Sequence, residues 1–404
     1  MSTEPALAPA QRGQWRAIAL FVALLLTLLS ACWSLVGSLL APVLPGGWWT
    51  VLGAALLLTA NPLATLLAAR ALGAYAGAPV RLLVFRPFWY ALFLLLLLTL
   101  AGAGGALLGA AFGRAAEAGR LAMLAATAMF AAVATAGYVG NRRLEIRRCV
   151  AALPGLPAAL DGLTIAQISD LHVGPQTSRL FLERVARAVR EASPELIAVT
   201  GDLVDDFPGD VDRYAEVLGR LAAPLGVYVV PGNHEVYTGW DAVRERLDRL
   251  PLRVLLNEAV TVSRNGGRLS VAGTGDPAFG PGSRGAAAPD IERALAGVPP
   301  GTFVLALAHN PALWPALAAR GVNLTLSGHT HWGQVAFPGL GWCLASPFLR
   351  LAMGVHVRGD SLLYIHPGTG YWGLPLRIGH AAQVALIELR RGERAALSDA
   401  AATR

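Results

Sequence analysis

Five short polar clusters between residues 170 and 331 each follow an apolar run, and their side chains are of the types that bind divalent metal ions. Carboxylate, amide and imidazole groups supply the oxygen and nitrogen ligands that hard and borderline cations prefer. Five of the chain's eight histidines fall inside these clusters, and no cysteine does. The clusters are Asp170-Leu171-His172, Gly201-Asp202, Gly232-Asn233-His234-Glu235, His309-Asn310 and Gly328-His329-Thr330-His331.

Seven of these side chains are candidate ligands, which is too many for one tetrahedral zinc ion. They suit two ions that share one carboxylate. Two ions about 3.5–4 Å apart clamp the attacking and leaving oxygens of a displacement at phosphorus, and they lower the pKa of bound water. His234 is the candidate proton donor for the leaving alkoxide. The candidate ligands are Asp170, His172, Asp202, Asn233, His309, His329 and His331.

The elements that must position these residues begin at residue 163, where apolar strand-like runs alternate with amphipathic helical stretches. Such an order predicts a largely parallel sheet covered by helices. Ligands then bind beyond the carboxyl ends of the strands, which is where each cluster falls. The predicted strands are 163–169, 195–200, 226–230, 259–263, 268–273, 302–308, 322–326, 361–365 and 383–388, with helices at 179–192, 211–221 and 241–250.

The first third of the chain differs in kind, because it is rich in apolar stretches. Hydrophobic residues make up 54% of the sequence and charged residues 15%, which is more apolar than an ordinary soluble protein. Each stretch is near the ~20 residues that a membrane-spanning helix needs. We predict spans at about 18–41, 48–69, 88–112 and 121–140, so that 1–141 is a transmembrane region, 142–162 a linker, 163–392 a catalytic domain and 393–404 a tail.

The net charge of +7 reflects membrane topology and not nucleic-acid binding. The chain has no lysine, and residues 1–148 hold 11 arginines against three acidic residues, whereas residues 149–404 hold 22 against 23. The excess flanks the apolar stretches, so we expect no nucleic-acid partner. A cytoplasmic N-terminus puts nine of these arginines inside and only Arg114 and Arg120 outside. The positive-inside rule therefore predicts a multi-pass inner-membrane protein with a cytoplasmic catalytic domain.

Two features of the apolar region carry alternatives. Asn61-Pro62 lies within the second predicted span and is interpreted as a helix kink, with a functional site as the alternative. Leu29-Ser30-Ala31-Cys32 resembles a lipoprotein cleavage site. Because apolar residues continue beyond Cys32, we expect a plain transmembrane helix there. The predicted membrane orientation is the same whether or not the chain is cleaved before Cys32. The three cysteines, Cys32, Cys149 and Cys343, are too scattered for a disulfide framework.

The order and spacing of the five clusters resemble the calcineurin-like metallophosphoesterases over about residues 160–390. Membrane-anchored bacterial members share the patterns at 328–334 and 373–377, Gly-His-x-His-x-Gly-Gln and Gly-Leu-Pro-Leu-Arg. The resemblance implies an α/β four-layer sandwich after the helical bundle, two divalent ions (Mn, Fe or Zn) and hydrolysis of a phosphate ester or pyrophosphate. It also implies that Asp170, His172, Asp202 and His331 hold one ion, that Asp202, Asn233, His309 and His329 hold the other, and that His234 is the acid or phosphate stabiliser.

Two departures from the family pattern concern the substrate and not the metal ligands. Trp332 stands where these relatives commonly have glycine, and the stretch 365–370, Ile-His-Pro-Gly-Thr-Gly, departs where they usually have a small polar residue before the glycines. His366, His356 and His380 are interpreted as structural. Asp205 and Asp206 are expected either to tune the site or to cap a helix, and Glu235 either to form hydrogen bonds behind the site or to be an ordinary polar loop residue.

The membrane region suggests a lipid-linked phosphate or pyrophosphate, and relatives that cleave a UDP-linked acylated sugar make that a concrete candidate. A soluble nucleotide is the alternative substrate. A non-catalytic scaffold is a third hypothesis, which the intact ligand set argues against. Eight apolar residues after the last cluster fit either a lipid path or the small core of a covering subdomain. They are Trp332, Val335, Phe337, Leu340, Trp342, Phe348, Leu349 and Met353.

Overall fold

The protein is described by a computed structural model that covers residues 9–71, 78–174, 177–279 and 288–400. The first eight residues of the predicted membrane region and the last four of the predicted tail lie outside it. The chain divides into two compact units, Met1–Ala134 and Thr135–Arg404. The boundary falls inside one continuous helix, α6 (Ala115–Asn141).

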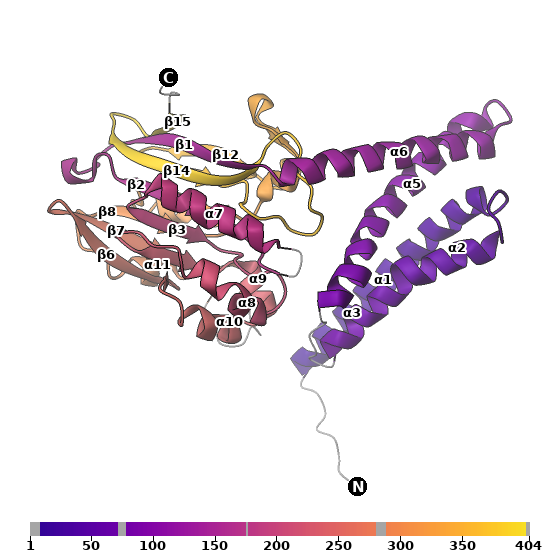
Figure 1. The fold of residues 1–404 in the computed structure, drawn as a ribbon, viewed down its shortest axis with the longest axis horizontal. Helices are drawn as coiled ribbons and strands as arrows, with labels where there is room; N and C mark the ends of the chain where they lie inside the picture. Colours follow the sequence, from indigo (N-terminus) through magenta and orange to yellow (C-terminus); the bar gives the residue numbers. More distant parts are fainter. Residues whose placement is uncertain (1–8, 72–77, 175–176, 280–287, 401–404) are drawn as a thin grey trace, which may run out of the picture. The chain divides into compact units, whose positions relative to one another are not determined.

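The first unit consists of apolar helices (Figure 1). Three helical stretches among the described residues are long and apolar enough to cross a membrane. Cys32 lies inside α1 (Pro9–Leu40), where it is buried together with Leu95 of α5 (Arg86–Ala110) and Met123 of α6. This burial agrees with a plain transmembrane helix. The candidate spans are Val22–Leu40, Arg81–Ala110 and Ala115–Asn141.

The second predicted span, 48–69, is divided and does not count among these candidates. A π-helical turn, η1 (Leu56–Ala60), separates α2 (Trp48–Ala55) from α3 (Asn61–Ala71). Pro62 explains the change, because proline cannot donate to the preceding turn and its ring clashes there. The sequence had indicated a kink at this position. The chain then continues through α4 (Ala78–Val80) and η2 (Arg81–Phe85) into α5.

The second unit contains a seven-stranded mixed sheet and a six-stranded sheet. In the first, β2 to β5 run parallel, while β14 pairs antiparallel with β2 and parallel with β1. Its order is β15 (Ala396–Asp399), β1 (Leu144–Leu153), β14 (Ala382–Arg391), β2 (Thr164–Ile168), β3 (Leu196–Thr200), β4 (Val227–Val230) and β5 (Arg253–Val254).

The six-stranded sheet has four parallel strands in its middle, β13, β9, β8 and β7. A hairpin with Asn265-Gly266 at its turn joins its last two strands. Ile165 and Leu196 of the first sheet and Leu305 and Leu326 of the second are fully buried in one shared core. The order is β12 (Gly354–Arg358), β13 (Ser361–Ile365), β9 (Leu324–Ser327), β8 (Phe303–Leu307), β7 (Gly267–Gly273) and β6 (Glu258–Arg264).

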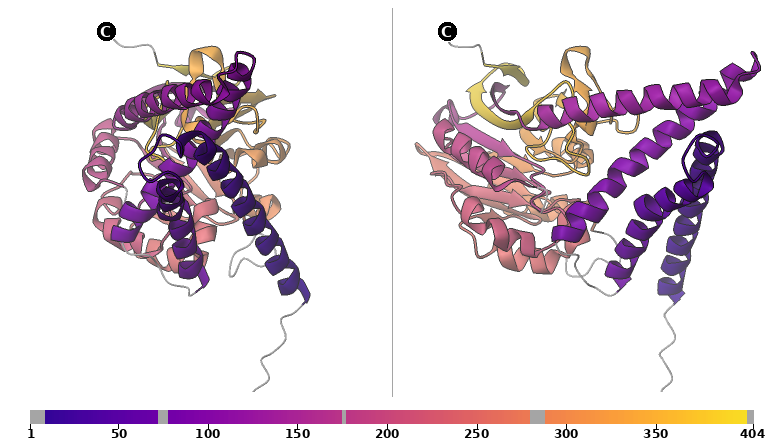
Figure 2. Two further views of the ribbon diagram at one scale, coloured as in Figure 1. Left: turned by 90° about the vertical axis from the view of Figure 1, so that its right-hand side faces the viewer. Right: turned by 45° about the vertical axis from the view of Figure 1, so that its right-hand side comes forward.

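Helices cover the outer faces of both sheets (Figures 1 and 2). Leu182, Val185 and Val189 lie one turn apart on α7 and pack with the first sheet. Leu317 packs against Ala306 of the second sheet. The helices are α7 (Arg179–Ala192), α8 (Gly209–Leu218), α9 (Asn233–Thr238), α10 (Trp240–Leu247), α11 (Ile291–Leu295) and α12 (Trp314–Ala318).

The predicted linker and tail both contain strands. β1 begins at Leu144 and pairs over its full length with β14, while β15 pairs with β1. Along β1, Cys149, Ala151 and Leu153 point into the core, and the residues between them are more exposed. This is the alternation of a half-buried strand. The arginines at its start had suggested a polar linker.

Replacing Leu305 with alanine tests the core between the sheets. Because Leu305 is fully buried there, we expect the free energy of unfolding to fall by about 2–5 kcal/mol. Urea unfolding of the full chain in detergent, followed by tryptophan fluorescence, measures the change. Val357→Ala is the control, because this β12 side chain is 49% exposed. Equal losses in both variants would contradict the assignment of this core.

Candidate metal centre

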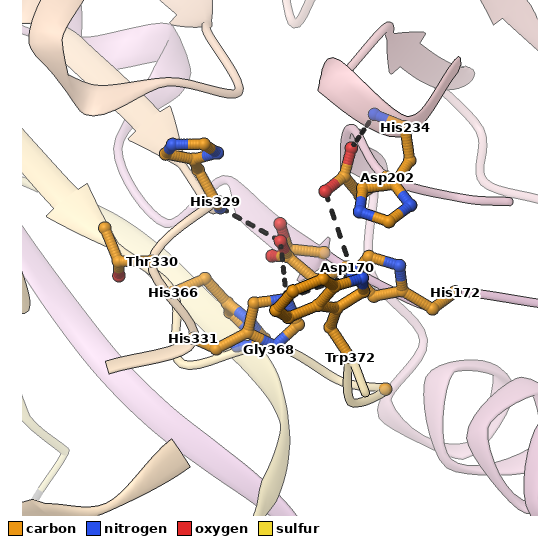
Figure 3. Close-up of polar contacts among 12 residues, drawn as sticks. Asp170, His172, Asp202, His234, His329, Thr330, His331, His366, Gly368 and Trp372 are labelled. Carbon is orange, nitrogen blue, oxygen red and sulfur yellow. Dashed lines mark hydrogen bonds and ion pairs between the residues drawn. The ribbon is translucent and has the colours of Figure 1, made fainter. Parts of the chain in front are cut away.

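The seven predicted ligands and His234 all lie just beyond the carboxyl ends of five strands, and Figure 3 shows Asp170, His172, Asp202, His234, His329 and His331 gathered there. Asp170 and His172 follow β2, and Asp202 follows β3. The second sheet contributes from β8 and β9. Parallel strands end at a common edge, so residues far apart in sequence meet there. The full order is Asp170 and His172 after β2, Asp202 after β3, Asn233 and His234 after β4, His309 after β8, and His329 and His331 after β9.

Asp170, His172 and His331 form one buried group with suitable ligand atoms. The Nε2 atoms of His172 and His331 lie 3.0 Å apart, and His331 Nε2 lies 3.3 Å from Asp170 Oδ1. Asp170 Oδ2, His172 Nδ1 and His331 Nδ1 are buried without a hydrogen-bond partner. The atoms that converge are the two Nε2 atoms and Asp170 Oδ1, and this set of donors fits a bound cation.

His309, Asn233 and His329 form a second group around Asp202. His309 Nε2 lies 3.3 Å from Asp202 Oδ2 and 3.2 Å from Asn233 Oδ1. His329 Nδ1 lies 2.8 Å from the same Asn233 oxygen. On its other side, His309 Nδ1 donates to the Thr200 carbonyl at 2.8 Å. This bond turns Nε2 toward the cluster and fixes the ring.

Asp202 lies between the two groups. Its Oδ2 is also 3.7 Å from His172 Nε2, and its Oδ1 accepts the backbone N–H of His234 at 2.9 Å. Figure 3 shows the carboxylate between these partners. One carboxylate in contact with both groups is the geometry that a shared ligand requires.

The protonation states follow from burial and from these contacts. Burial alone would raise the pKa of Asp202, but the charge of His309 outweighs it and holds that pKa well below the ordinary value. Burial would lower the pKa of His309, and Asp202 reverses this and raises it. Burial lowers the pKa of His329 to about 4 and that of His331 below its usual range. His329 and His331 are therefore neutral at pH 7, the state in which imidazole binds a metal ion, whereas the raised pKa of His309 means that this ring loses a proton when a metal ion binds.

His234 is oriented by the loop after β3. Its Nδ1 lies 2.6 Å from the Asp205 carbonyl oxygen, which can only accept, so Nδ1 carries a proton and Nε2 is the remaining nitrogen. The ring lies edge-on to His172, with 4.6 Å between centroids. Trp372 and Tyr237 are half or more exposed and flank it at 6.1 and 5.9 Å. His234 thus lies between the ligands and an aromatic rim.

Asp205 belongs to the site more closely than the sequence indicated. Its Oδ1 lies 3.5 Å from His172 Nδ1 and 3.8 Å from His234 Nδ1, and the three residues form a third possible metal-holding group. The following helix, α8, is capped by Pro208 without a side-chain bond. Of the two predicted roles, tuning of the site therefore fits. Its place three residues after Asp202 was the available signal.

Glu235 is buried and hydrogen-bonds the backbone behind the ligands, the first of its two predicted roles. Its carboxylate accepts the N–H groups of Asp202, Leu203 and Val204 at 3.0, 2.7 and 3.0 Å. It also accepts that of Gly232 at 2.7 Å. Four bonds from two loops fix the backbone on which Asp202 and Asn233 are mounted.

The two departures from the family pattern touch one another. Trp332 is buried in a left-handed conformation (φ 51°), and its indole N–H donates to the Ile365 carbonyl at 3.0 Å. His366 is also buried, and its Nδ1 accepts the Gly368 N–H. It is absent from the three metal-holding groups, as are His356 and His380, among the residues that the structure describes.

Two charged residues near the site were missed. Arg377 is fully buried and donates to the carbonyls of Pro367, Gly368 and Gly370. It shapes a loop whose Gly370 N–H donates to the Asp170 carbonyl at 2.9 Å. Asp276 follows β7, and burial raises its pKa. The shared pattern at 373–377 and the strand end at Gly273 were the signals for these residues.

Glu235→Gln tests the role of this carboxylate. An amide cannot accept from all four N–H groups, so buried donors lose their partner, at about 1–3 kcal/mol each. We expect a lower free energy of unfolding and a lower metal content, measured by urea unfolding and by elemental analysis. Glu191→Gln, at an exposed position on α7, is the matched control. Unchanged metal content in Glu235→Gln would show that the four bonds do not position the ligands.

Comparisons with known proteins agree with the site. A family model described as calcineurin-like phosphoesterase matches residues 163–333. A Bacillus subtilis protein named uncharacterized metallophosphoesterase YkuE is 30% identical over 241 residues, which cover 58% of this chain and 82% of that protein. A Bos taurus protein named transmembrane protein with metallophosphoesterase domain is 34% identical over 248 residues, covering 58% of this chain and 54% of its own length.

The chain spans about half the length of the two vertebrate relatives, from Bos taurus and Danio rerio. Among solved structures, a calcineurin-like phosphoesterase from Bacillus subtilis is 17% identical with a TM-score of 0.32, covering 42% of this chain and 72% of its own. A putative 5'-nucleotidase from Staphylococcus aureus is 13% identical with a TM-score of 0.36, covering 51% and 49%. Similarity at this level does not bear on the substrate.

Proposed function

The chain belongs to the calcineurin-like phosphoesterase family, and on that premise we propose that it is a dimetal-dependent phosphoesterase. The observation that carries the proposal is the convergence of two His/Asp groups on one shared carboxylate, Asp202. The Nε2 atoms of His172 and His331 converge with Asp170 Oδ1 in one of these groups. A scaffold without catalysis would not need this desolvated arrangement, which costs free energy in the absence of metal.

Two divalent ions, of Mn, Fe or Zn, are held on this proposal by the two groups described above. The donor set of imidazole, carboxylate and amide, without thiolate, suits each of these metals. The first ion takes Asp170, His172, Asp202 and His331, and the second takes Asp202, Asn233, His309 and His329. When bound, such ions polarise the phosphoryl oxygens and lower the pKa of water that attacks phosphorus.

His234 then serves the leaving group. Because Nδ1 is held by the Asp205 carbonyl, Nε2 is the atom that contacts a phosphoryl oxygen or gives a proton to the departing alkoxide. The Asp205 carboxylate also lies 3.8 Å from Nδ1, on the same side of the ring as the Asp205 carbonyl. Trp372 and Tyr237 beside His234 offer flat apolar faces to the leaving part of the substrate.

The substrate on this proposal is membrane-associated, for example a UDP-linked acylated sugar with a pyrophosphate bond. The three candidate spans in the same chain support this. We retain the proposal of four spans, a cytoplasmic catalytic domain in the inner membrane and a four-layer sandwich. The domain begins earlier than the predicted residue 163, since β1 starts at Leu144. A soluble nucleotide remains the alternative substrate.

Turnover of an aryl phosphodiester by the full chain in detergent tests the mechanism. With Mn present, we expect His234→Ala to lower kcat by about 10²–10⁴-fold with both ions retained, because a positioned acid contributes that much. Asp202→Asn should lose metal as well as activity, because its carboxylate contacts both groups. Arg148→Gln, at an exposed site outside the centre, is the control. Full metal-dependent activity in His234→Ala would overturn the assigned role.

The acyl chain distinguishes the two substrate classes. If lipid contact contributes to binding, kcat/KM for an acylated UDP-sugar should exceed that for its deacylated form by about tenfold or more, since each buried methylene contributes about 0.8 kcal/mol. Both compounds would be assayed at matched Mn and detergent concentrations. Equal values would favour the soluble nucleotide.

A further inference from the structure

The segment 335–353 follows the last ligands and is almost free of charge. Between His331 and His356 the sequence holds one charged residue, Arg350. The segment forms a short hairpin of β10 (Ala336–Phe337) and β11 (Trp342–Cys343), joined by η6 (Pro338–Leu340). Turns then lead on to β12. We refer to it as the apolar hairpin segment.

This segment exposes large apolar side chains. Leu340 is 80% exposed and Phe348 82%, while Phe337 and Trp342 are each 41% exposed and Leu344 is 48% exposed. The rings of Phe337 and Trp342 stack across the hairpin, with centroids 6.2 Å apart. Large exposed apolar side chains gathered within one short segment indicate an interaction surface.

The exposed residues are additional to a core that the segment already has. Ala336 and Cys343 point inward and pack with Trp332, Trp314 and Leu363. Because successive strand residues point to opposite faces, Phe337 and Trp342 face outward. Of the eight apolar residues for which the sequence left a lipid path or a small core open, Trp332 and Met353 belong to this core. Leu340 and Phe348 remain largely exposed, and Phe337 and Trp342 are covered only in part, by one another.

We propose that the apolar hairpin segment inserts into the surface of the bilayer that the N-terminal helices span. The catalytic unit starts at this surface, because β1 begins at Leu144, directly after the candidate span that ends at Asn141. Tryptophan, phenylalanine and leucine around a single arginine are the composition of an interfacial element. Arg350 can contact lipid phosphate. Insertion would cover every exposed apolar residue of the segment.

The segment is also tied to the rim of the metal centre. Gln334 Oε1 accepts the N–H of Trp372 at 3.0 Å, and its Nε2 donates to the Leu374 carbonyl at 3.2 Å. The Ala336 N–H donates to the Ile378 carbonyl at 2.9 Å. Trp372 lies beside His234. The inserted face therefore continues into the site, so that a phosphoester at headgroup depth could reach it; this consequence rests on the proposed function.

Spin labels on cysteine substitutions test the insertion directly. Leu340→Cys and Phe348→Cys would be labelled in the full chain in phosphatidylcholine–phosphatidylglycerol vesicles, with Val357→Cys on β12 as the exposed control. The native cysteines are buried, so the unsubstituted chain gives the background. We expect high collision rates with oxygen and low rates with a polar nickel chelate at 340 and 348, and the reverse at 357.

Labels at 340 and 348 that match 357 would place the segment in water, and labels shielded from both reagents would show a protein partner, such as a second copy. Either result overturns the proposal.

A kinetic comparison separates this proposal from the proposed function. Leu340→Asp with Phe348→Asp should lower turnover of a phosphoester dispersed in vesicles by about tenfold or more, because a charged side chain opposes insertion. Turnover of a soluble aryl phosphodiester should not change, since neither residue lies in the metal centre. An equal loss on both substrates would contradict the insertion. If the unsubstituted chain cleaves neither substrate, the proposed function fails, whereas the spin-label result stands on its own.

Discussion

Seven polar side chains meet at one rim in a space from which water is largely excluded, and the surrounding backbone must hold them there against their desolvation. Asp170, Asp202 and His329 adopt left-handed conformations (φ 54°, 49° and 71°), which cost about 1–2 kcal/mol each for residues with a side chain. Gly328 lies so close to Ser169 and Asp170 that a Cβ atom would overlap both. Backbone strain of this kind persists only where neighbouring contacts over-determine it. The bonds at the strand ends are those contacts.

Two buried charges provide much of this support, and both act on backbone groups. Glu235 accepts four N–H groups from the loops that carry Asp202 and Asn233. Arg377 donates to three carbonyls of the loop behind Asp170, and burial lowers its pKa to about 10, so it stays charged at pH 7. A buried charge is costly unless its hydrogen bonds are complete. The carbonyls and N–H groups of these loops supply the hydrogen bonds that Glu235 and Arg377 need. Neither residue therefore has to form an ion pair with one of the candidate ligands.

The local sequence patterns predicted most of the second unit, because the spacing of apolar residues and the polar residues at strand ends can be read from neighbouring residues. The predicted helix at 179–192 is α7 from its first residue to its last, and the five clusters follow five strands. Features that depend on distant partners were not predicted. β1 has arginines at its start, and only pairing with β14, over two hundred residues later, makes it a strand. In the same way, Arg377 shapes its loop through hydrogen bonds to carbonyls that only the fold brings within reach. The hydrogen bond from Trp332 to Ile365 likewise connects the two departures from the family pattern, which lie more than thirty residues apart in the sequence.

The loop behind the ligands also meets the end of the last candidate span. The Arg377 N–H donates to the Gly137 carbonyl of α6 at 2.9 Å, and a side chain at Gly140 would collide with the Arg377 carbonyl. On its other side this loop is bonded to Gln334, which directly precedes the apolar hairpin segment. One loop thus connects a helix end, the backbone of Asp170 and the exposed hairpin. The last turn of α6, which belongs to the second unit, therefore contacts the same loop that holds the backbone of Asp170.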